Sequence, residues 1–290
     1  FDMNKIIIPA IGLLFFLASC QKEVSVDLGG SGGNGGGGGG ATNGDLLSKI
    51  TAAGASENYT VEYTYDASKR VIRIVYTGTS SGQNIGNDTR VVRNAAGIIT
   101  QTIEKNAGVP DSSITIVNYN AASGRYESKI MEITTQGFSA IDSSVFVYDG
   151  TGKIVQVDEY LSNPGIGLDP FLAAKTVYTY DAAGNNVTFK ILSADPLGGP
   201  DEVLAETTIG YDTKVNPLIL SAGEAVILGD PSMASPNNPT KYDYKDVANA
   251  GTSSFLLDFT YTYNTKNKPA TSSYTQTPGG GVTNNTYTYK

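Results

Sequence analysis

From about residue 46 onward, apolar and polar residues alternate in short runs that are separated by turn-forming residues. Residues 61–65 read Val-Glu-Tyr-Thr-Tyr, and residues 71–76 read Val-Ile-Arg-Ile-Val-Tyr. A period of two is typical of a β-strand that has one buried side and one solvent-facing side. Asp66 lies between these runs, and its side chain can bond to the backbone two residues on, which favours a tight turn. The pattern therefore predicts a β-hairpin.

The same unit returns along the chain as a strand, an Asp or Asn, a short turn that often contains Gly, and a second strand. The residue before the Asp or Asn lies at positions 65, 93, 119, 148, 180, 211 and 263, so the spacings are 28, 26, 29, 32, 31 and 52. A period near 30 residues indicates a repeat architecture. Because the last spacing is nearly two units, we expect a degenerate copy at Tyr244. The sequence finishes with half a unit, from Tyr287 to Lys290.

Hairpins joined in series predict an all-β fold, an antiparallel meander of about 14 to 18 strands at two strands for each unit. A sheet of that size twists, and closure removes its exposed edges. We therefore expect a strongly curved sheet or a large barrel, complete or incomplete. Residues 45–50 have a weak helical pattern, but 49–51 resemble the strand at 129–133, so we expect a first strand there. A membrane-spanning barrel needs lipid-facing apolar residues, which runs such as 126–129 and 271–276 lack.

Residues 3–20 follow a different pattern. Lys5 precedes an apolar run from Ile6 to Ala18. As a helix this run would reach roughly 20 Å, which is short of a bilayer core of about 30 Å. A short apolar run with a basic start is typical of a signal peptide. We predict that residues 1–19 are a signal peptide.

The apolar run ends in Leu17, Ala18, Ser19 and Cys20. This sequence resembles the lipobox of bacterial lipoproteins, in which a large aliphatic residue and two small residues precede the Cys. The resemblance implies diacylglycerol on the Cys20 thiol, cleavage after Ser19 and acylation of the new amino terminus. Cys20 is the only Cys in the chain, which agrees with this role. An ordinary signal peptide with a chance Cys is the alternative.

Residues 20–44 connect this anchor to a repetitive domain at 45–290. Residues 29–40 read GGSGGNGGGGGG, which predicts a flexible tether, with a reach of roughly 25 Å over residues 21–44. No Asp follows Cys20, so the best-known signal for inner-membrane retention is missing and we expect the outer membrane. Residues 20–23, Cys-Gln-Lys-Glu, resemble the start of surface-export signals in Bacteroidetes-type lipoproteins. We therefore favour the cell surface over the periplasmic face.

The composition limits the chemistry that this chain can perform. With no His and one Cys, the chain has no Ser-His-Asp triad, no His-ligated zinc and no internal disulfide. A net charge of −8 argues against binding to nucleic acid. The acidic pairs at 158–159 and 201–202 would point to opposite faces of a strand, so neither forms a catalytic dyad by itself. We predict no catalytic residue, no metal and no cofactor, and we do not expect an enzyme; a glycan hydrolase is the distant alternative.

Two sets of residues recur at equivalent positions. The acidic or amide set opens the turns, and we interpret it as turn-forming rather than as calcium ligands, because calcium loops place several oxygens within a dozen residues. Its members are Asp66, Asp149, Asp181, Asp212 and Asn264. The aromatic set would form ladders that stack on sugar rings or bind protein, or that pack across strands to stabilise a thin sheet, and we favour packing. Its members are Tyr63, Tyr65, Tyr178, Tyr180, Tyr261 and Tyr263.

The unit that carries Tyr148, Asp149, Gly152 and Lys153 resembles the YD repeat of RHS-type proteins. The whole arrangement of lipobox, Gly-rich tether and tandem hairpins is similar to Bacteroidetes-type lipoproteins, domains of unknown function with a porin-like fold. The resemblance covers roughly residues 46–290 and implies an architecture rather than an activity. We expect a membrane-anchored exported lipoprotein that binds glycan or an envelope protein without catalysis; a purely structural envelope scaffold is the alternative.

Overall fold

The computed structural model of the chain describes residues 46–108, 112–135, 138–194, 199–218, 220–229, 231–249 and 253–290. The predictions of a signal peptide at 1–19, a lipobox ending at Cys20 and a tether at 20–44 lie outside the described residues. Within the described ranges, no helix is long and apolar enough to span a membrane.

Sixteen strands make up most of the described chain, together with one α-helix and two short 3₁₀ helices. The helical elements are η1 (Pro164–Ile166), α2 (Ala222–Leu228) and η2 (Pro231–Ala234). The strands are β1 (Leu47–Gly54), β2 (Glu57–Tyr65), β3 (Val71–Ser80), β4 (Gln83–Arg93), β5 (Ile99–Asn106), β6 (Ser113–Asn120), β7 (Arg125–Thr135), β8 (Phe138–Tyr148), β9 (Ile154–Asn163), β10 (Leu168–Tyr180), β11 (Asn186–Ser193), β12 (Glu202–Val215), β13 (Asn237–Asp246), β14 (Phe255–Tyr263), β15 (Pro269–Thr277) and β16 (Val282–Tyr289).

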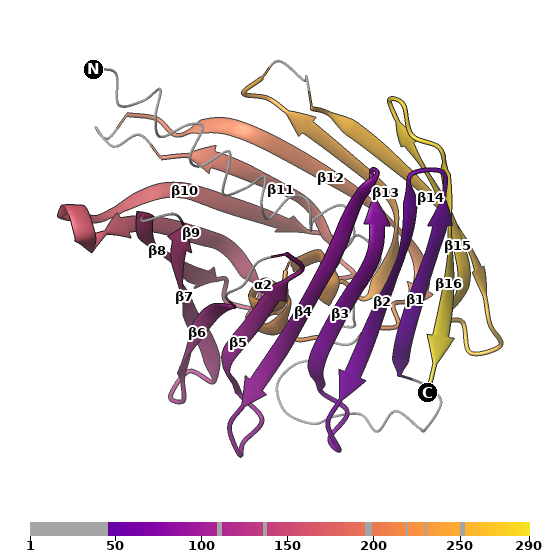
Figure 1. Cartoon of the computed structure of the whole chain (residues 1–290), viewed down its shortest axis with the longest axis horizontal. Coiled ribbons are helices and arrows are strands. Elements are labelled where there is room, and N and C mark those ends of the chain that lie inside the picture. Colours follow the sequence, from indigo (N-terminus) through magenta and orange to yellow (C-terminus); the bar gives the residue numbers. More distant parts are fainter. Residues whose placement is uncertain are drawn as a thin grey trace.

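Each strand pairs antiparallel with its neighbours in sequence, and β1 also pairs with β16, so the sheet closes into a barrel (Figure 1). Ile50 of β1 opposes Tyr287 of β16 across this closing pair. A closed barrel leaves no strand edge unpaired. The predicted all-β antiparallel meander is confirmed, and of the two forms expected for the sheet the complete barrel is the one that is formed.

The period-two pattern gives the barrel wall two different sides. On β2, Val61 and Tyr63 are 1% and 2% exposed and face the interior, while Glu62 between them is exposed on the outer wall. The same alternation runs through the neighbouring strands, because paired residues of adjacent strands share a face. Apolar and aromatic side chains of β1–β3 and β16 thereby form one cluster inside the barrel.

Between β12 and β13 the chain makes no tight turn. Instead, the described residues between them, 216–218, 220–229 and 231–236, fold back into the barrel and contain α2 and η2, and we call them the plug (Figure 1). Ala225 and Met233 are 0% and 2% exposed against the inner side of β1–β3. Val226 and Ile227 pack against the inner cluster that strands β4–β9 contribute. The plug therefore contacts the inner wall on two sides.

The plug also corrects one prediction from the sequence. We expected a degenerate hairpin unit at Tyr244 to fill the spacing of 52 residues. This is wrong, because Tyr244 lies within β13 and opposes Thr207 and Phe255 in a regular ladder. The extra length is the plug, which is inserted where the other units have a short turn.

Candidate functional site

The turns that begin with an Asp or Asn, such as those between β2 and β3 and between β8 and β9, lie at one end of the barrel, which we call the turn end. Asp149 Oδ1 accepts hydrogen bonds from the backbone N–H of Thr151 at 2.8 Å and of Lys153 at 3.0 Å. The Thr151 hydroxyl, together with these N–H groups, holds the pKa of Asp149 below its usual value. The backbone N–H groups of Arg70, Asn185 and Lys268 bond in the same way to Asp66, Asp181 and Asn264. These side chains organise their own turns.

Asp212 keeps only part of that pattern. It lies inside β12, and the plug follows the strand, so the expected turn at Asp212 is not formed. Its carboxylate still accepts a hydrogen bond from the backbone N–H two residues on, that of Lys214, at 2.8 Å. It also accepts hydrogen bonds from the backbone N–H and the side-chain amide of Asn238 on β13. It also accepts one from the hydroxyl of Tyr263. Asp212 therefore ties together the strands on both sides of the insertion.

Tyrosine hydroxyls form a second set of contacts around the turn end, which we call the tyrosine belt. The Tyr at the end of one strand donates to the backbone carbonyl at the start of the strand before it. These hydrogen bonds join Tyr65 to Leu47, Tyr148 to Tyr126, Tyr180 to Ile154 and Tyr289 to Pro269 at 2.7 Å each, and Tyr211 to Asn186 at 2.8 Å. On β4, Arg93 takes the place of the Tyr and donates to the carbonyl of Val71.

Basic side chains cover the rings of the tyrosine belt. The Lys153 ammonium lies 4.9 Å from the ring centroid of Tyr180, and Lys290 lies 5.3 Å from that of Tyr65. Cations in this position are attracted by the ring face. Burial raises the pKa of Tyr65 far above its usual value and raises the pKa of Tyr148 to about 12. The belt therefore keeps its hydroxyls protonated and engaged.

The aromatic residues singled out from the sequence do not present an open ladder on the surface. Tyr63 is 2% exposed, and Tyr178 packs against Phe189 with ring centroids 6.1 Å apart. The remaining members are half-buried and occupy the positions that contact their neighbours through hydrogen bonds or stacked rings: Tyr65, Tyr180, Tyr261 and Tyr263. Their geometry is that of cross-strand packing.

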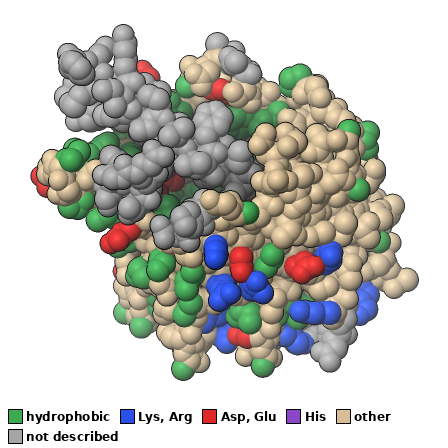
Figure 2. Space-filling model, in the orientation of Figure 1, with side chains coloured by type: hydrophobic (Ala, Val, Ile, Leu, Met, Phe, Trp, Pro, Cys, Tyr) green, Lys and Arg blue, Asp and Glu red, His purple; other side chains and the backbone are tan. Residues whose placement is uncertain are grey.

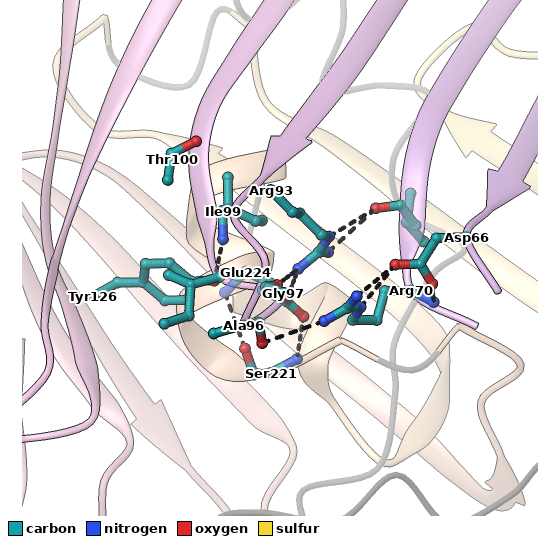
Figure 3. A network of polar contacts seen from close by, with 12 residues as sticks. Asp66, Arg70, Arg93, Ala96, Gly97, Ile99, Thr100, Tyr126, Ser221 and Glu224 are labelled. Atoms are coloured by element: carbon teal, nitrogen blue, oxygen red, sulfur yellow. Dashed lines mark hydrogen bonds and ion pairs between the residues drawn. The ribbon is translucent and has the colours of Figure 1, made fainter. Parts of the chain in front are cut away.

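A buried ion pair fixes the plug to the barrel wall (Figure 3). The Arg93 guanidinium donates to Glu224 Oε1 at 2.5 Å and to the Gly97 carbonyl at 2.8 Å, and the two charged side chains are 5% and 17% exposed. Glu224 also completes a capping box with Ser221 at the start of α2. At the other end of the helix, Lys129 Nζ donates to the Val226 carbonyl at 3.0 Å.

Sequence reasoning missed this attachment, although two signals were present. One is the Arg at position 93, where other units carry Tyr. The other is Ser221-x-x-Glu224 before an apolar run, which is typical of a helix start.

The inner wall of β4–β9 also carries polar groups. Thr89, Asn87, Asn106 and Glu104 form a chain of side-chain hydrogen bonds. Asp142 faces the same side, and burial raises the pKa of its carboxyl while the Lys129 ammonium lowers it by less. Among the described residues, no group of three or more His, Cys, Asp or Glu side chains comes together as a metal site. The inner wall thus offers amides and carboxylates.

Oppositely charged pairs stand on the outer wall. Lys49 and Glu62 lie 3.0 Å apart, and the same kind of contact joins other neighbouring strands at distances up to 3.5 Å: Arg73 to Asp88, and Lys190 to Glu206. Figure 2 shows acidic and basic side chains together on the face that carries β2–β5. Thr side chains occupy many of the remaining outward positions, for example Thr60 opposite Thr77 and Thr262 opposite Thr271. The described outer wall is largely hydrophilic.

The fold is similar to two crystal structures of porin-like proteins from Bacteroides species. The one from Bacteroides uniformis has a TM-score of 0.50 at 12% identity and covers 84% of this chain and 98% of that chain. The one from Bacteroides vulgatus has a TM-score of 0.50 at 11% identity and covers 85% of this chain and 99% of that chain. No protein-family model matches the chain, and the comparison with curated proteins gave no match either. The expected porin-like fold is confirmed at the level of fold alone, whereas identity as an RHS-type YD-repeat lipoprotein is not supported.

Proposed function

We propose that this chain is an exported lipoprotein whose plugged barrel stands in water at the end of a lipid tether and acts by binding rather than by catalysis. The observation that carries this proposal is the outer wall, where charged pairs on β1–β4 and on β11–β12 occupy outward positions. A barrel immersed in a bilayer presents an apolar band there instead. The described wall is suited to water on its outside.

A barrel immersed in the bilayer would expose its outward charges to lipid. An Arg or Lys on the lipid-facing side of a barrel costs about 2–4 kcal/mol near the middle of the bilayer. Arg73 and Lys190 face outward from strands on different parts of the barrel, and their side chains are each 45% exposed. Immersion of the barrel would bring several such costs together without an apolar band to offset them.

The attachment to the membrane comes from the proposed lipid on Cys20. Several acyl chains on one N-terminal residue exceed the single-chain threshold for stable anchoring. The tether at 20–44 then allows the barrel to stand clear of the membrane surface. The residues after Cys20 support the outer membrane, with the cell surface favoured over the periplasmic face.

Binding is favoured over catalysis by the placement of the acidic residues. Asp158 opposes the outward Val145 and Lys175, whereas Glu159 opposes the buried Ser144, so this acidic pair divides between the two sides of the wall. Asp201 is paired with Lys175 at 2.6 Å. Neither acidic pair forms the facing carboxylates that a glycosidase uses.

The inner wall supports a glycan as the ligand class. A barrel of 16 strands encloses more space than its wall side chains fill, and here the plug occupies the turn end. Asn87, Asn106 and Glu104 place amides and a carboxylate on the inner side, and these groups hydrogen-bond well to sugar hydroxyls. An envelope protein is the other binding partner that we expected from the sequence.

The experiment that tests the proposal cuts the tether. A protease site placed within residues 29–40 of the full chain is cleaved on washed membranes, and the same chain without the site is the control. The barrel is expected in the supernatant after cleavage, without detergent. A cleaved barrel that stays with the membrane through an alkaline carbonate wash would show that it is embedded, and the proposal would be wrong.

The released barrel also serves for the ligand. On a glycan array, Asn106→Ala is expected to lose the binding that the parent barrel shows. Asn118→Ala removes an exposed amide on β6 and is the matched control. Binding that survives Asn106→Ala would place the ligand elsewhere, and a parent barrel that binds no glycan would contradict the glycan assignment.

A further inference from the structure

One sector of the outer wall differs from the rest. Eleven large hydrophobic residues are exposed among the described residues, and six of them lie on β4, β6, β7 and β8. We call these six the aliphatic patch: Val92, Ile114, Ile116, Ile130, Val145 and Val147, which are 36–47% exposed. The other five lie in η1 or close to a strand end. Figure 2 shows hydrophobic side chains at the lower left, beside the charged ones, where β5–β7 lie in Figure 1.

The strand register makes the central part of the patch continuous. Ile116 opposes Ile130 on β7 and Gln101 on β5, and Gln101 opposes Val92 on β4. The next outward row contains Ile114, which opposes Ile103 on β5. Because residues that oppose each other share a face, these side chains form two adjacent aliphatic rows across β4–β7.

Charges of opposite sign flank the row that contains Ile103 and Ile114. Arg90 opposes Ile103, and its side chain is 65% exposed and lies 3.9 Å from Asp88. On the other flank, Thr115 opposes Met131, so the register places Ile114 beside Glu132, which is exposed. The row therefore reads Arg90, Ile103, Ile114, Glu132, with a positive end and a negative end.

We infer that this surface binds a second copy of this chain, around a two-fold axis that runs along the strands between β5 and β6. A rotation about that axis keeps each row at its own height and reverses its order. It brings Ile103 onto the partner's Ile114 and Arg90 onto the partner's Glu132. It also brings Val92 onto the partner's Ile130. The surface is thus complementary to itself, as a two-fold interface must be.

The charges fix the orientation of the two copies. An axis perpendicular to the strands that runs along this row would place Arg90 against the same residue of the partner, which repels. Because the barrel wall curves away from the axis, the flanking positions lie further from the partner than the central ones. In the row of Ile103 and Ile114, the long side chains of Arg90 and Glu132 stand on these flanks, while the two Ile side chains occupy the centre.

The size of the patch also fits a protein partner. Six aliphatic side chains at this exposure present an apolar area of roughly 400 Å². A specific interface buries about 800 Å² on each partner, of which about 56% is apolar. The patch with its charged rim therefore matches one such interface. It contains no Trp, Phe or Leu, the residues that anchor proteins in membrane interfaces, which favours a second copy over a lipid surface.

This inference rests on the proposed function, because the patch is open to a second copy only if the outer wall stands in water. The test uses the barrel released by cutting the tether and measures its sedimentation equilibrium. We expect a dimer, and Arg90→Glu or Glu132→Arg alone should raise its dissociation constant by about tenfold or more. The double variant that exchanges the two charges should restore dimerisation. Lys190→Glu reverses an outer charge away from the patch and should leave the dimer unchanged.

The outcomes separate the two proposals. A barrel that stays in the membrane after cleavage contradicts the proposed function itself. A released barrel that sediments as a monomer at all concentrations overturns the dimer alone. A dimer that is insensitive to Ile114→Lys and to both charge reversals overturns it as well, because the interface then lies elsewhere. A monomer that binds lipid vesicles and loses this binding on Ile114→Lys would identify a lipid surface as the occupant instead.

Discussion

Replacement of Glu224 by Gln tests how the plug is held. Glu224 accepts a hydrogen bond from Arg93, and both side chains are nearly removed from water. Gln has the same size and can still complete the capping box with Ser221. The substitution therefore removes the negative charge and leaves the helix start largely intact.

The expected loss of stability depends on the hydrogen bonds that Arg93 keeps in the variant. Loss of one partner of a fully buried ion pair costs about 3–5 kcal/mol, because an uncompensated charge is left behind. Arg93 keeps its hydrogen bonds to the carbonyls of Val71 and Gly97, and the Gln carbonyl still accepts one. We therefore expect a smaller loss, about 2 kcal/mol, which is the difference between charged and neutral hydrogen bonds plus part of the burial cost.

Hydrogen exchange of α2 measures this loss locally. The amide of Ala225 donates to the Ser221 carbonyl, and that of Gly229 donates to the Ala225 carbonyl, so both exchange when the plug opens. A loss of about 2 kcal/mol accelerates exchange roughly 30-fold. Lys190→Gln, which breaks an exposed ion pair on the outer wall, should leave these amides unchanged.

A second variant separates charge from packing. The double substitution Arg93→Met and Glu224→Met replaces the ion pair with apolar side chains, which is often neutral in buried sites. It should restore part of the protection that Glu224→Gln removes, because Met neither completes the capping box with Ser221 nor donates to the carbonyls of Val71 and Gly97. If the α2 amides of the Glu224→Gln variant exchange at the parent rate, the apolar contacts alone hold the plug and the reasoning is refuted.

Three further outcomes are expected. Burial raises the pKa of Asp142, so its ionised form destabilises the fold, and Asp142→Asn should raise the free energy of unfolding at pH 7. This gain should fade as the pH falls through the raised pKa and be gone below about pH 3.9. An equal gain at all pH values would contradict this. The pKa values of Tyr126 and Tyr148 are raised to about 12, so ultraviolet titration should show both ionising well above the usual pKa near 10, and normal titration in the folded barrel would refute their burial. Tyr180→Phe removes the hydroxyl that bonds to Ile154 and should lower the free energy of unfolding by about 1 kcal/mol; a denaturation midpoint equal to the parent's would show that this contact of the tyrosine belt contributes nothing.

The strands and turns were predictable because their causes are local. Alternation at 61–65 shows which side chains share a face, and an Asp such as Asp149 bonds to amides within four residues of itself. The plug was not predictable in this way. Its apolar residues are ordinary for a short helix, and its position depends on Arg93, which is 131 residues from Glu224 in sequence. Nothing in the local pattern links two residues so far apart.

The tyrosines show a related limit. Their recurrence predicted equivalent positions, but the choice between an open ladder and packing depends on what lies next to each ring. The answer involves the strand before each Tyr, as in the bond from Tyr180 to Ile154, and a cation from the previous turn, as in Lys153 over the same ring. The register between neighbouring units decides whether a Tyr ring packs or stays open, and the sequence of a single unit does not contain that register.

Closure of the barrel follows the same rule as its hairpins. At the turn between β2 and β3, the amide of Asp66 donates to the carbonyl of Arg70. Between β16 and β1, the amide of Leu46 donates to the carbonyl of Lys290, and the amide of Lys290 donates to the carbonyl of Leu46. The two strands therefore pair as a hairpin does, although no turn joins them. Because the Lys290 ammonium also lies over the ring of Tyr65, the tyrosine belt continues across this junction, and the closing pair is held by the contacts that hold the others.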